Sequence, residues 1–298
     1  MAPASDGVGG PGAEPPGSST MARMKSYPNG GLLVTPAQLS SEIEGRRPLL
    51  ILDLRPPDAY TTGHVPGALH LDLWGVSLPD TDPAPLDAFM WMIEHVLAIH
   101  GVANDVPVVV YDEQSGVRAA RAFWFLEYFG HPSVRLLDGG FGAWSRAGLP
   151  VSRYAAPAPA GDWTGKRELQ TIATWREVKS AIGSEGSVIV DTRSDGEYCG
   201  TTVRAKRGGA IPGAVHIEWT RNLGSDGAFR PEAELREMYE RAGVTPDREV
   251  LTYCQGGYRA AHSYIALRLL GYPRVRNYVG SWKEWGDRED LPIEVPKA

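Results

Sequence analysis

The segment 250–271 reads VLTYCQGGYRAAHSYIALRLLG and decides how the chain folds. Residues 250–253 are apolar and β-prone, whereas residues 260–270 have helical spacing and end at Gly271. Cys254 therefore lies between a strand and the N-terminus of a helix. At such a position, free backbone N–H groups and the helix dipole lower the pKa of a cysteine and bind an anion attached to its sulfur. The segment predicts an activated thiol beyond the carboxyl end of a strand.

The chain repeats itself at an offset of 141 residues. Between positions 118–144 and 259–285, 10 of 27 residues are identical, including Arg-Ala-Ala at the start and Trp144 and Trp285 at the end. Upstream, the strand end Asp53-Leu54-Arg55 matches Asp191-Thr192-Arg193, and VPGALH at 65–70 matches IPGAVH at 211–216. Because the order of motifs is the same in both halves, we expect two copies of one domain.

Each copy alternates short apolar strands with amphipathic helices. Strands are expected near 49–54, 107–112 and 134–137 and again near 188–192, 249–254 and 275–278; helices are expected near 36–44, 86–100, 117–130, 174–182, 232–242 and 260–270. This alternation predicts an α/β fold in which each domain has a mostly parallel central sheet flanked by helices. Ligands of such sheets bind beyond the carboxyl ends of the strands, where Cys254 is placed.

Composition divides the chain into four parts. Residues 1–29 are rich in Gly, Pro, Ala and Ser and predict a disordered tail. Residues 30–147 form the first domain, and residues 168–298 form the second. Residues 148–167 contain several prolines and glycines, which indicates a linker on the surface.

Charge and cysteine content exclude several classes of protein. A net charge of −6 argues against a nucleic-acid partner or an anionic membrane. No apolar run approaches the ~20 residues that span a bilayer, so we expect no membrane association. The two cysteines, Cys199 and Cys254, lack disulfide-framework or zinc-site spacing, so we expect no metal, no cofactor and a cytoplasmic location. Cys199 lacks the strand-to-helix setting and is interpreted as a bystander.

The two Asp-x-Arg strand ends, the Pro-Gly-Ala turns, the loop cysteine and the closing Gly-x-x-x-x-Trp together resemble the tandem-domain rhodanese sulfurtransferases. The resemblance covers roughly Leu32 to Pro292 and implies an inactive first domain and a catalytic second domain. In the first copy Asp112 stands where the second has Cys254, and an aspartate cannot accept a sulfane sulfur. We leave open whether Asp112 is a solvated carboxylate or forms hydrogen bonds between the domains.

The resemblance implies that Cys254 is the catalytic nucleophile and carries the transferred sulfur as a persulfide. Substrate-binding residues are expected in its loop, namely Gln255, Gly256, Gly257, Tyr258 and Arg259. The Arg259 guanidinium suits a thiosulfonate or carboxylate group. Asp191 with Arg193, as a buried pair, and His64 are expected to support the site. The expected partners are a small anionic sulfur donor and a cyanide or thiol acceptor, with a protein acceptor such as a thioredoxin as a further possibility.

The donor is predicted to be thiosulfate, with 3-mercaptopyruvate as the alternative. Related mercaptopyruvate enzymes use a loop serine with a histidine of the first domain; His64 matches that histidine, but Gly256 stands at the serine position. Glu197 occupies the place of a donor-binding arginine in vertebrate members, and the inserted run Arg204–Arg207 is a candidate source of the missing charge.

Two other functions have to be weighed against sulfur transfer. A phosphatase is disfavoured because related phosphatases place five residues between the cysteine and arginine of the loop, whereas four separate Cys254 from Arg259. A non-catalytic sulfur-binding protein would have a thiol at Cys254 of ordinary reactivity. Rapid alkylation of this thiol near neutral pH would favour the enzyme.

Overall fold

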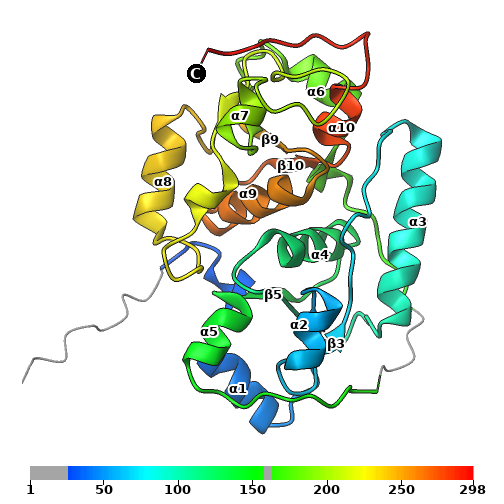
Figure 1. The fold of residues 1–298 in the computed structure, drawn as a ribbon, viewed down its shortest axis with the longest axis vertical. Helices are drawn as coiled ribbons and strands as arrows, with labels where there is room; N and C mark the ends of the chain where they lie inside the picture. The colour runs from blue at the N-terminus through cyan, green and yellow to red at the C-terminus, as the bar shows by residue number, and fades with distance from the viewer. Residues whose placement is uncertain (1–25, 158–162, 298) are drawn as a thin grey trace, which may run out of the picture.

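A computed structural model of the protein describes residues 26–157 and 163–297. It contains two parallel sheets of five strands each, one per domain (Figure 1). The first sheet has the order β1 (Leu33–Val34), β5 (Val134–Leu137), β4 (Val108–Tyr111), β2 (Leu50–Asp53), β3 (Leu69–His70). The second repeats it as β6 (Ile172–Ala173), β10 (Val275–Tyr278), β9 (Glu249–Tyr253), β7 (Ser187–Asp191), β8 (Val215–His216). The α/β fold and the duplication predicted from the sequence are confirmed.

Helices flank both sheets. The first domain contains α1 (Pro36–Glu44), α2 (Pro57–Thr62), α3 (Pro83–Ile99), α4 (Val117–Tyr128) and α5 (Gly140–Arg146), and the second contains α6 (Trp175–Ala181), α7 (Asp195–Tyr198), α8 (Glu232–Arg241), α9 (Tyr258–Leu269) and α10 (Ser281–Trp285). The long strands and helices agree with the sequence to within a few residues. The strands β1, β3, β6 and β8, two residues each, and the short helices α2, α5, α7 and α10 are additional, because segments this short carry no readable periodicity.

The central strands are buried on both faces, as their continuous apolar sequence requires. In β4, Val108 and Val110 pack toward α3 and α4, whereas Val109 and Tyr111 pack toward α1 and α5. The second sheet repeats this alternation around β9. Because the strands are parallel and in register, Asp112 and Cys254 each follow the central strand of their sheet.

Helices α4 and α9 pack against each other between the two sheets (Figure 1). Their apolar faces belong to one hydrophobic core, which includes Phe123, Trp124 and Leu126 of α4 and Tyr264, Ile265 and Leu267 of α9. Each helix follows the loop at the end of its central strand, so this packing also brings the two loops to the domain boundary. The Cys254 loop and its degenerate copy therefore lie at one shared interface.

The segment that precedes each domain packs on the other domain's central helix. Glu168 N–H donates to the carbonyl of Tyr128 at the end of α4 (2.7 Å), and Asn29 N–H donates to Leu269 at the end of α9 (3.2 Å). Tyr27 is 7% exposed, and its hydroxyl donates to the carbonyl of Arg230.

The expectation that residues 1–29 form a disordered tail is therefore wrong for residues 26–29, which are ordered against the second domain. The reason is tertiary: Tyr27 is one aromatic side chain in a polar segment, and it becomes buried only because the second domain provides a surface for it. Residues 1–25 lie outside the described residues.

Candidate active site

Cys254 lies at the carboxyl end of β9, and α9 begins four residues later. Its side chain is buried, with the residue 1% exposed, and the Gly257 N–H points at the sulfur across 3.1 Å. The Cys254 N–H donates to the hydroxyl of Ser281 at the start of α10 (3.1 Å), which fixes the loop from its other side. Gly257 adopts φ +85°, and a side chain there would collide with the guanidinium of Arg121. The loop thus closes tightly over one sulfur atom.

The surroundings of Cys254 favour the thiolate. Burial alone raises the pKa of the thiol, but the charge of Arg259 and N–H groups of Ala260 and Gly256 act in the opposite direction and prevail. The pKa of Cys254 therefore lies below its ordinary value. A thiolate is the nucleophilic form of cysteine, so this shift of the pKa is in the direction that an activated thiol requires.

Arg259 is held by a carboxylate rather than free in the cleft. Its two terminal nitrogens donate to the two carboxylate oxygens of Glu197 at 2.6 and 2.9 Å. The Glu197 side chain is 2% exposed, and its pKa falls to about 2 because hydrogen bonds and charge from Arg259 outweigh the effect of burial. Glu197, which has the wrong sign to bind a donor anion, is therefore the counter-ion of Arg259.

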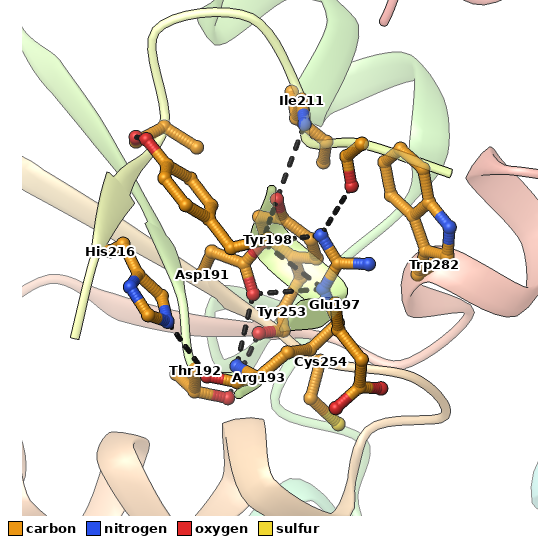
Figure 2. A network of polar contacts seen from close by, with 12 residues as sticks. Asp191, Thr192, Arg193, Glu197, Tyr198, Ile211, His216, Tyr253, Cys254 and Trp282 are labelled. Atoms are coloured by element: carbon orange, nitrogen blue, oxygen red, sulfur yellow. Dashed lines mark hydrogen bonds and ion pairs between the residues drawn. The ribbon is translucent and has the colours of Figure 1, made fainter. Parts of the chain in front are cut away.

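The expected buried pair of Asp191 and Arg193 is present and braces the strand from which Cys254 emerges (Figure 2). Arg193 bonds Asp191 through two nitrogens (2.5 and 2.9 Å) and the carbonyl of Gly209 (2.7 Å). The hydroxyl of Tyr253, the residue before Cys254, donates to Asp191 (2.5 Å). In the first domain Asp53, Arg55 and Tyr111 form the same three-way contact, so this brace is common to both copies.

A cleft of about 680 Å³ opens between the domains above Cys254. The second domain contributes Cys254, Gln255, Gly256, Tyr258, Arg259, Arg204, Trp219, Lys283 and Asp287, and the first contributes Trp74, Gly75, Ser77 and Val117. Four of the five predicted binding residues thus line the cleft; Gly257 bonds the sulfur from behind. The Tyr258 hydroxyl is already bound to the carbonyls of Leu73 and Val76 (2.6 and 2.8 Å), so its aromatic ring, not its hydroxyl, is available to a ligand.

Sequence reasoning missed Lys283 and Ser77. Lys283 is on α10, and its ammonium donates across the domain boundary to the Ser77 hydroxyl (3.0 Å). Among the described residues no carboxylate forms an ion pair with Lys283. The motif comparison gave no signal for it, because Gly142 occupies the equivalent position in the first copy. Its place beside Cys254 depends on α10 folding against the loop, where its own N–H donates to the carbonyl of Gln255 (2.9 Å).

The inserted run 204–207 contributes one side chain to the cleft. Arg204 lines it, with its Nε 3.6 Å from Glu197, and the Arg204 carbonyl accepts a hydrogen bond from Gln255 (2.9 Å). Arg207 turns away and donates to the carbonyls of Trp285 and Leu291 (2.9 Å each). Within the insertion, Arg204 therefore forms part of the cleft wall, and Arg207 holds the segment after α10 in place.

Asp112 is neither solvated nor engaged between domains, contrary to both expectations. Its buried carboxylate accepts backbone N–H groups of its own loop, from Gly116 (3.0 Å), Arg118 (2.9 Å) and Ala119 (3.0 Å), with Gln114 more distant (3.3 Å). The physical reason is that a loop leading into a helix presents unpaired donors, and a short carboxylate at the loop's first position reaches them. Burial raises the pKa of Asp112 to about 6 despite these hydrogen bonds, so at neutral pH the first copy carries its own internal anion.

His64 does not line the cleft, so its expected supporting role near the site is corrected. Its Nδ1 bonds the carbonyl of Tyr60 (2.9 Å), its Nε2 bonds that of Tyr154 (3.2 Å), and its backbone forms a β-bridge with Ser152. Ala210 occupies the equivalent position in the second domain and bridges Glu294 in the same way. His64 thus fastens the chain that leaves the first sheet, because the duplicated turn places it at that edge.

Elsewhere in residues 26–157 and 163–297, no three His, Cys, Asp or Glu side chains converge as a metal site would require. Over the same residues, no helix combines the length and the apolar character needed to cross a bilayer. Cys199 caps the end of α7 and is partly exposed.

Comparison with known proteins agrees with this geometry. The family model for the rhodanese-like domain matches residues 35–147 and 174–288. The thiosulfate sulfurtransferase of Pseudomonas aeruginosa is 36% identical over 273 residues, covering 89% of this chain and 97% of that protein. The sulfur carrier protein TtuD of Thermus thermophilus is 36% identical over 254 residues, covering 78% and 86%. The crystal structure of YnjE superimposes with a TM-score of 0.80 at 26% identity, covering 93% of this chain and 71% of that one.

The chain belongs to the rhodanese family and consists of two rhodanese-like domains in tandem. It is a sulfurtransferase, and two relatives that it covers over 97% of their length are named thiosulfate sulfurtransferases.

Proposed function

We propose that the protein transfers the sulfane sulfur of thiosulfate to a thiophilic acceptor through a persulfide on Cys254. The Cys254 thiolate attacks the outer sulfur of thiosulfate, a new S–S bond forms, and the bond to the sulfonate sulfur breaks, so sulfite leaves with the bonding electron pair. Cyanide or a thiolate then attacks the terminal sulfur, takes it, and restores the Cys254 thiolate. The observation that carries the proposal is the buried, amide-contacted sulfur of Cys254 at the base of a cleft lined by cations.

Lys283 and Arg204 hold the sulfonate end of the donor in this proposal. Arg259 is committed to Glu197, so its net charge toward a ligand is small, whereas the Lys283 ammonium has only the Ser77 hydroxyl as its side-chain partner among the described residues. Arg204 is 61% exposed and able to turn toward a ligand. A dianion such as thiosulfate gains more from two cations than the monoanion 3-mercaptopyruvate does. The glycine at position 256 and the remote His64 also speak against mercaptopyruvate.

The acceptor reaches the persulfide through the same cleft. Gln255, Gly256, Gly257 and Tyr258 form the walls and amides around the transferred sulfur, and their amides stabilise its charge in the manner of an oxyanion hole. A small acceptor such as cyanide fits inside. The same proposal includes a protein acceptor such as a thioredoxin, in the cytoplasm. An extended loop of that protein would bring its cysteine into the cleft between the domains.

Intact-mass measurement tests the persulfide. Wild-type protein incubated with thiosulfate should gain one sulfur atom, and cyanide should remove it; Cys199→Ser should behave like wild type, and Cys254→Ser should gain nothing. A Cys254→Ser protein that still gains a cyanide-labile sulfur would contradict the proposal. Alkylation followed by peptide mapping distinguishes a non-catalytic sulfur-binding protein, since in an enzyme Cys254 should react with iodoacetamide near neutral pH faster than an ordinary thiol of pKa ~8.5.

Steady-state kinetics test the donor. With cyanide as the acceptor, kcat/KM should be higher for thiosulfate than for 3-mercaptopyruvate. The reverse order would assign the protein to the mercaptopyruvate enzymes while leaving the Cys254 persulfide intact.

A further inference from the structure

Arg121 is a fully buried cation of the first domain that reaches into the catalytic loop of the second. It lies on α4, is 0% exposed, and donates from Nη1 to the carbonyl of Gly256 (2.9 Å). Its Nε and Nη2 atoms are buried without a hydrogen-bond partner among the described residues, and no carboxylate there forms an ion pair with it. Buried charges of this kind are normally paired, so this guanidinium needs an anion that the resting contacts do not provide.

The rings of Phe125 and Tyr258 lie 4.8 and 4.6 Å from the Arg121 guanidinium carbon. These contacts orient the guanidinium and hold it in an apolar site, but they do not neutralise it. Gly257 is next to both groups: a side chain on it would clash with Arg121, and its N–H points at the Cys254 sulfur across 3.1 Å. The Cys254 thiolate is therefore an anion that acts on Arg121: its charge favours the charged guanidinium, and Arg121 in turn helps to lower the pKa of Cys254.

The duplicated residue shows what is particular about Arg121. At the offset of 141 residues its counterpart is His262 on α9, which reaches across the interface to the Ser115 carbonyl of the first loop (2.7 Å). The two helices thus send equivalent side chains to each other's loop. Burial lowers the pKa of His262 to about 4, so it is neutral. The degenerate loop receives a neutral hydrogen bond. The catalytic loop receives a cation at neutral pH, because burial lowers the pKa of Arg121 only to about 10.

Other charges that surround Cys254 are arranged differently. Arg259 is balanced by the Glu197 carboxylate of α7, which also lies 3.6 Å from Nε of Arg204. Arg204, Asp287 and, from α10, Lys283 line the open cleft. Tyr258 carries the remaining titratable group and stays protonated, because burial raises its pKa. Arg121 differs from these cations: it is fully buried, and no carboxylate of the described residues forms an ion pair with it.

We propose that Arg121 is a positioning residue for sulfur transfer, supplied by the non-catalytic domain, which fixes the Gly256 carbonyl and stabilises the negative charge of the Cys254 thiolate and persulfide. The inference rests on the proposed function, because the thiolate and then the persulfide of Cys254 are the anions that the buried cation would face during the reaction. The first domain then contributes charge to the site as well as a wall.

Neutral variants at position 121 test this charge. R121Q keeps a donor for the Gly256 carbonyl but removes the charge. R121M removes both the charge and that donor and brings no polar atom of its own into the buried site, and it serves the same comparison if R121Q does not fold. The rate of Cys254 alkylation by iodoacetamide is measured from pH 5 to 10. We expect the midpoint of the profile to move to higher pH and the rate at pH 7 to fall about tenfold, with the rates converging at pH 10.

Two further variants separate charge from structure. R121K keeps the charge and should give a profile near that of wild type. R118Q removes another arginine of α4, one that is partly exposed and pairs with Asp72, and it should leave the profile unchanged. Superimposable profiles for the folded neutral variant and wild type would overturn the inference, as would an R121K profile as shifted as that of R121Q. Failure of the proposed function is a separate result, because it appears as wild-type protein that gains no sulfur from thiosulfate.

Discussion

Glu197 and Arg259 form a two-point ion pair at 2.6 and 2.9 Å directly beside the Cys254 loop. The charge of Arg259 lowers the pKa of Cys254. The carboxylate of Glu197 offsets much of the same charge toward a ligand in the cleft. Glu197→Gln should lower the KM for thiosulfate and shift Cys254 alkylation to lower pH, because it releases positive charge. Steady-state kinetics and alkylation profiles measure both effects.

The same substitution should lower stability in a pH-dependent way. The pKa of Glu197 is depressed to about 2 in the folded protein, so its contribution is fully present above the unfolded value near 4.5 and is lost as the pH falls toward 2. At pH 7, Glu197→Gln should cost on the order of 2 kcal/mol in the free energy of unfolding, and the difference should vanish near pH 2. Glu234→Gln, which affects an exposed pair with Arg230, is the matched control and should change little. A constant difference from pH 7 to pH 2 would contradict the linkage.

Lys283→Met should weaken donor binding without affecting the thiol. Because the ammonium is expected to hold the sulfonate group, the KM for thiosulfate should rise about tenfold, equivalent to about 1.4 kcal/mol, with a small change in kcat. Alkylation by anionic iodoacetate should slow more than alkylation by neutral iodoacetamide. Lys179→Met, on the exposed side of α6, is the control. An unchanged KM in Lys283→Met would assign the donor anion to Arg204 or Arg259 instead.

Asp112→Ala should empty the amide cradle of the first loop. Removing the carboxylate leaves buried N–H donors of Gly116, Arg118 and Ala119 unpaired and should cost about 2–3 kcal/mol of stability. Inorganic sulfate should then raise the Tm of the variant more than that of wild type, because an external anion replaces the internal one. Glu113→Ala removes an exposed carboxylate from the same loop and should show no such response. Equal sulfate responses in Asp112→Ala and wild type would show that the cradle collapses without its carboxylate.

Tyr27→Ala should destabilise the protein although Tyr27 lies outside both matched domains. The side chain is buried against the second domain, and its removal should cost about 2–4 kcal/mol in the free energy of unfolding. Tyr154→Ala, which removes a side chain of a residue that is 88% exposed, is the control for chemical denaturation. A loss no larger than in that control would show that residues 26–29 do not stabilise the fold.

The long strands, the long helices and the duplication could be read from the sequence because each is recorded in a local pattern. Residues 250–253 are continuously apolar, and residues 260–270 have helical periodicity, so their states follow from burial and backbone hydrogen bonding alone. Cys254 could be placed between them for the same reason. The buried pair of Asp191 and Arg193 could also be predicted. The two residues are two positions apart at a strand end, so the backbone itself brings their side chains together.

Lys283, Arg121 and the fate of Asp112 could not be read in this way. Lys283 and Arg121 reach the catalytic loop from α10 and from the other domain's α4, so their positions depend on helix packing and not on spacing along the chain. His64 was misplaced because a match to a motif says which turn a residue occupies but not which way the turn faces.

The sequence by itself determined a duplicated α/β chain with a cysteine, Cys254, at the end of a central strand, because strands, helices and loop donors are set by local sequence. Tertiary structure alone decided the electrostatics of that cysteine. It paired Arg259 with Glu197, filled the degenerate loop with the Asp112 carboxylate, and carried Arg121 of the first domain into the loop of the second. Charges act over ångströms in space, and only the packing of α4 against α9 determines which of them lie within that reach of the sulfur.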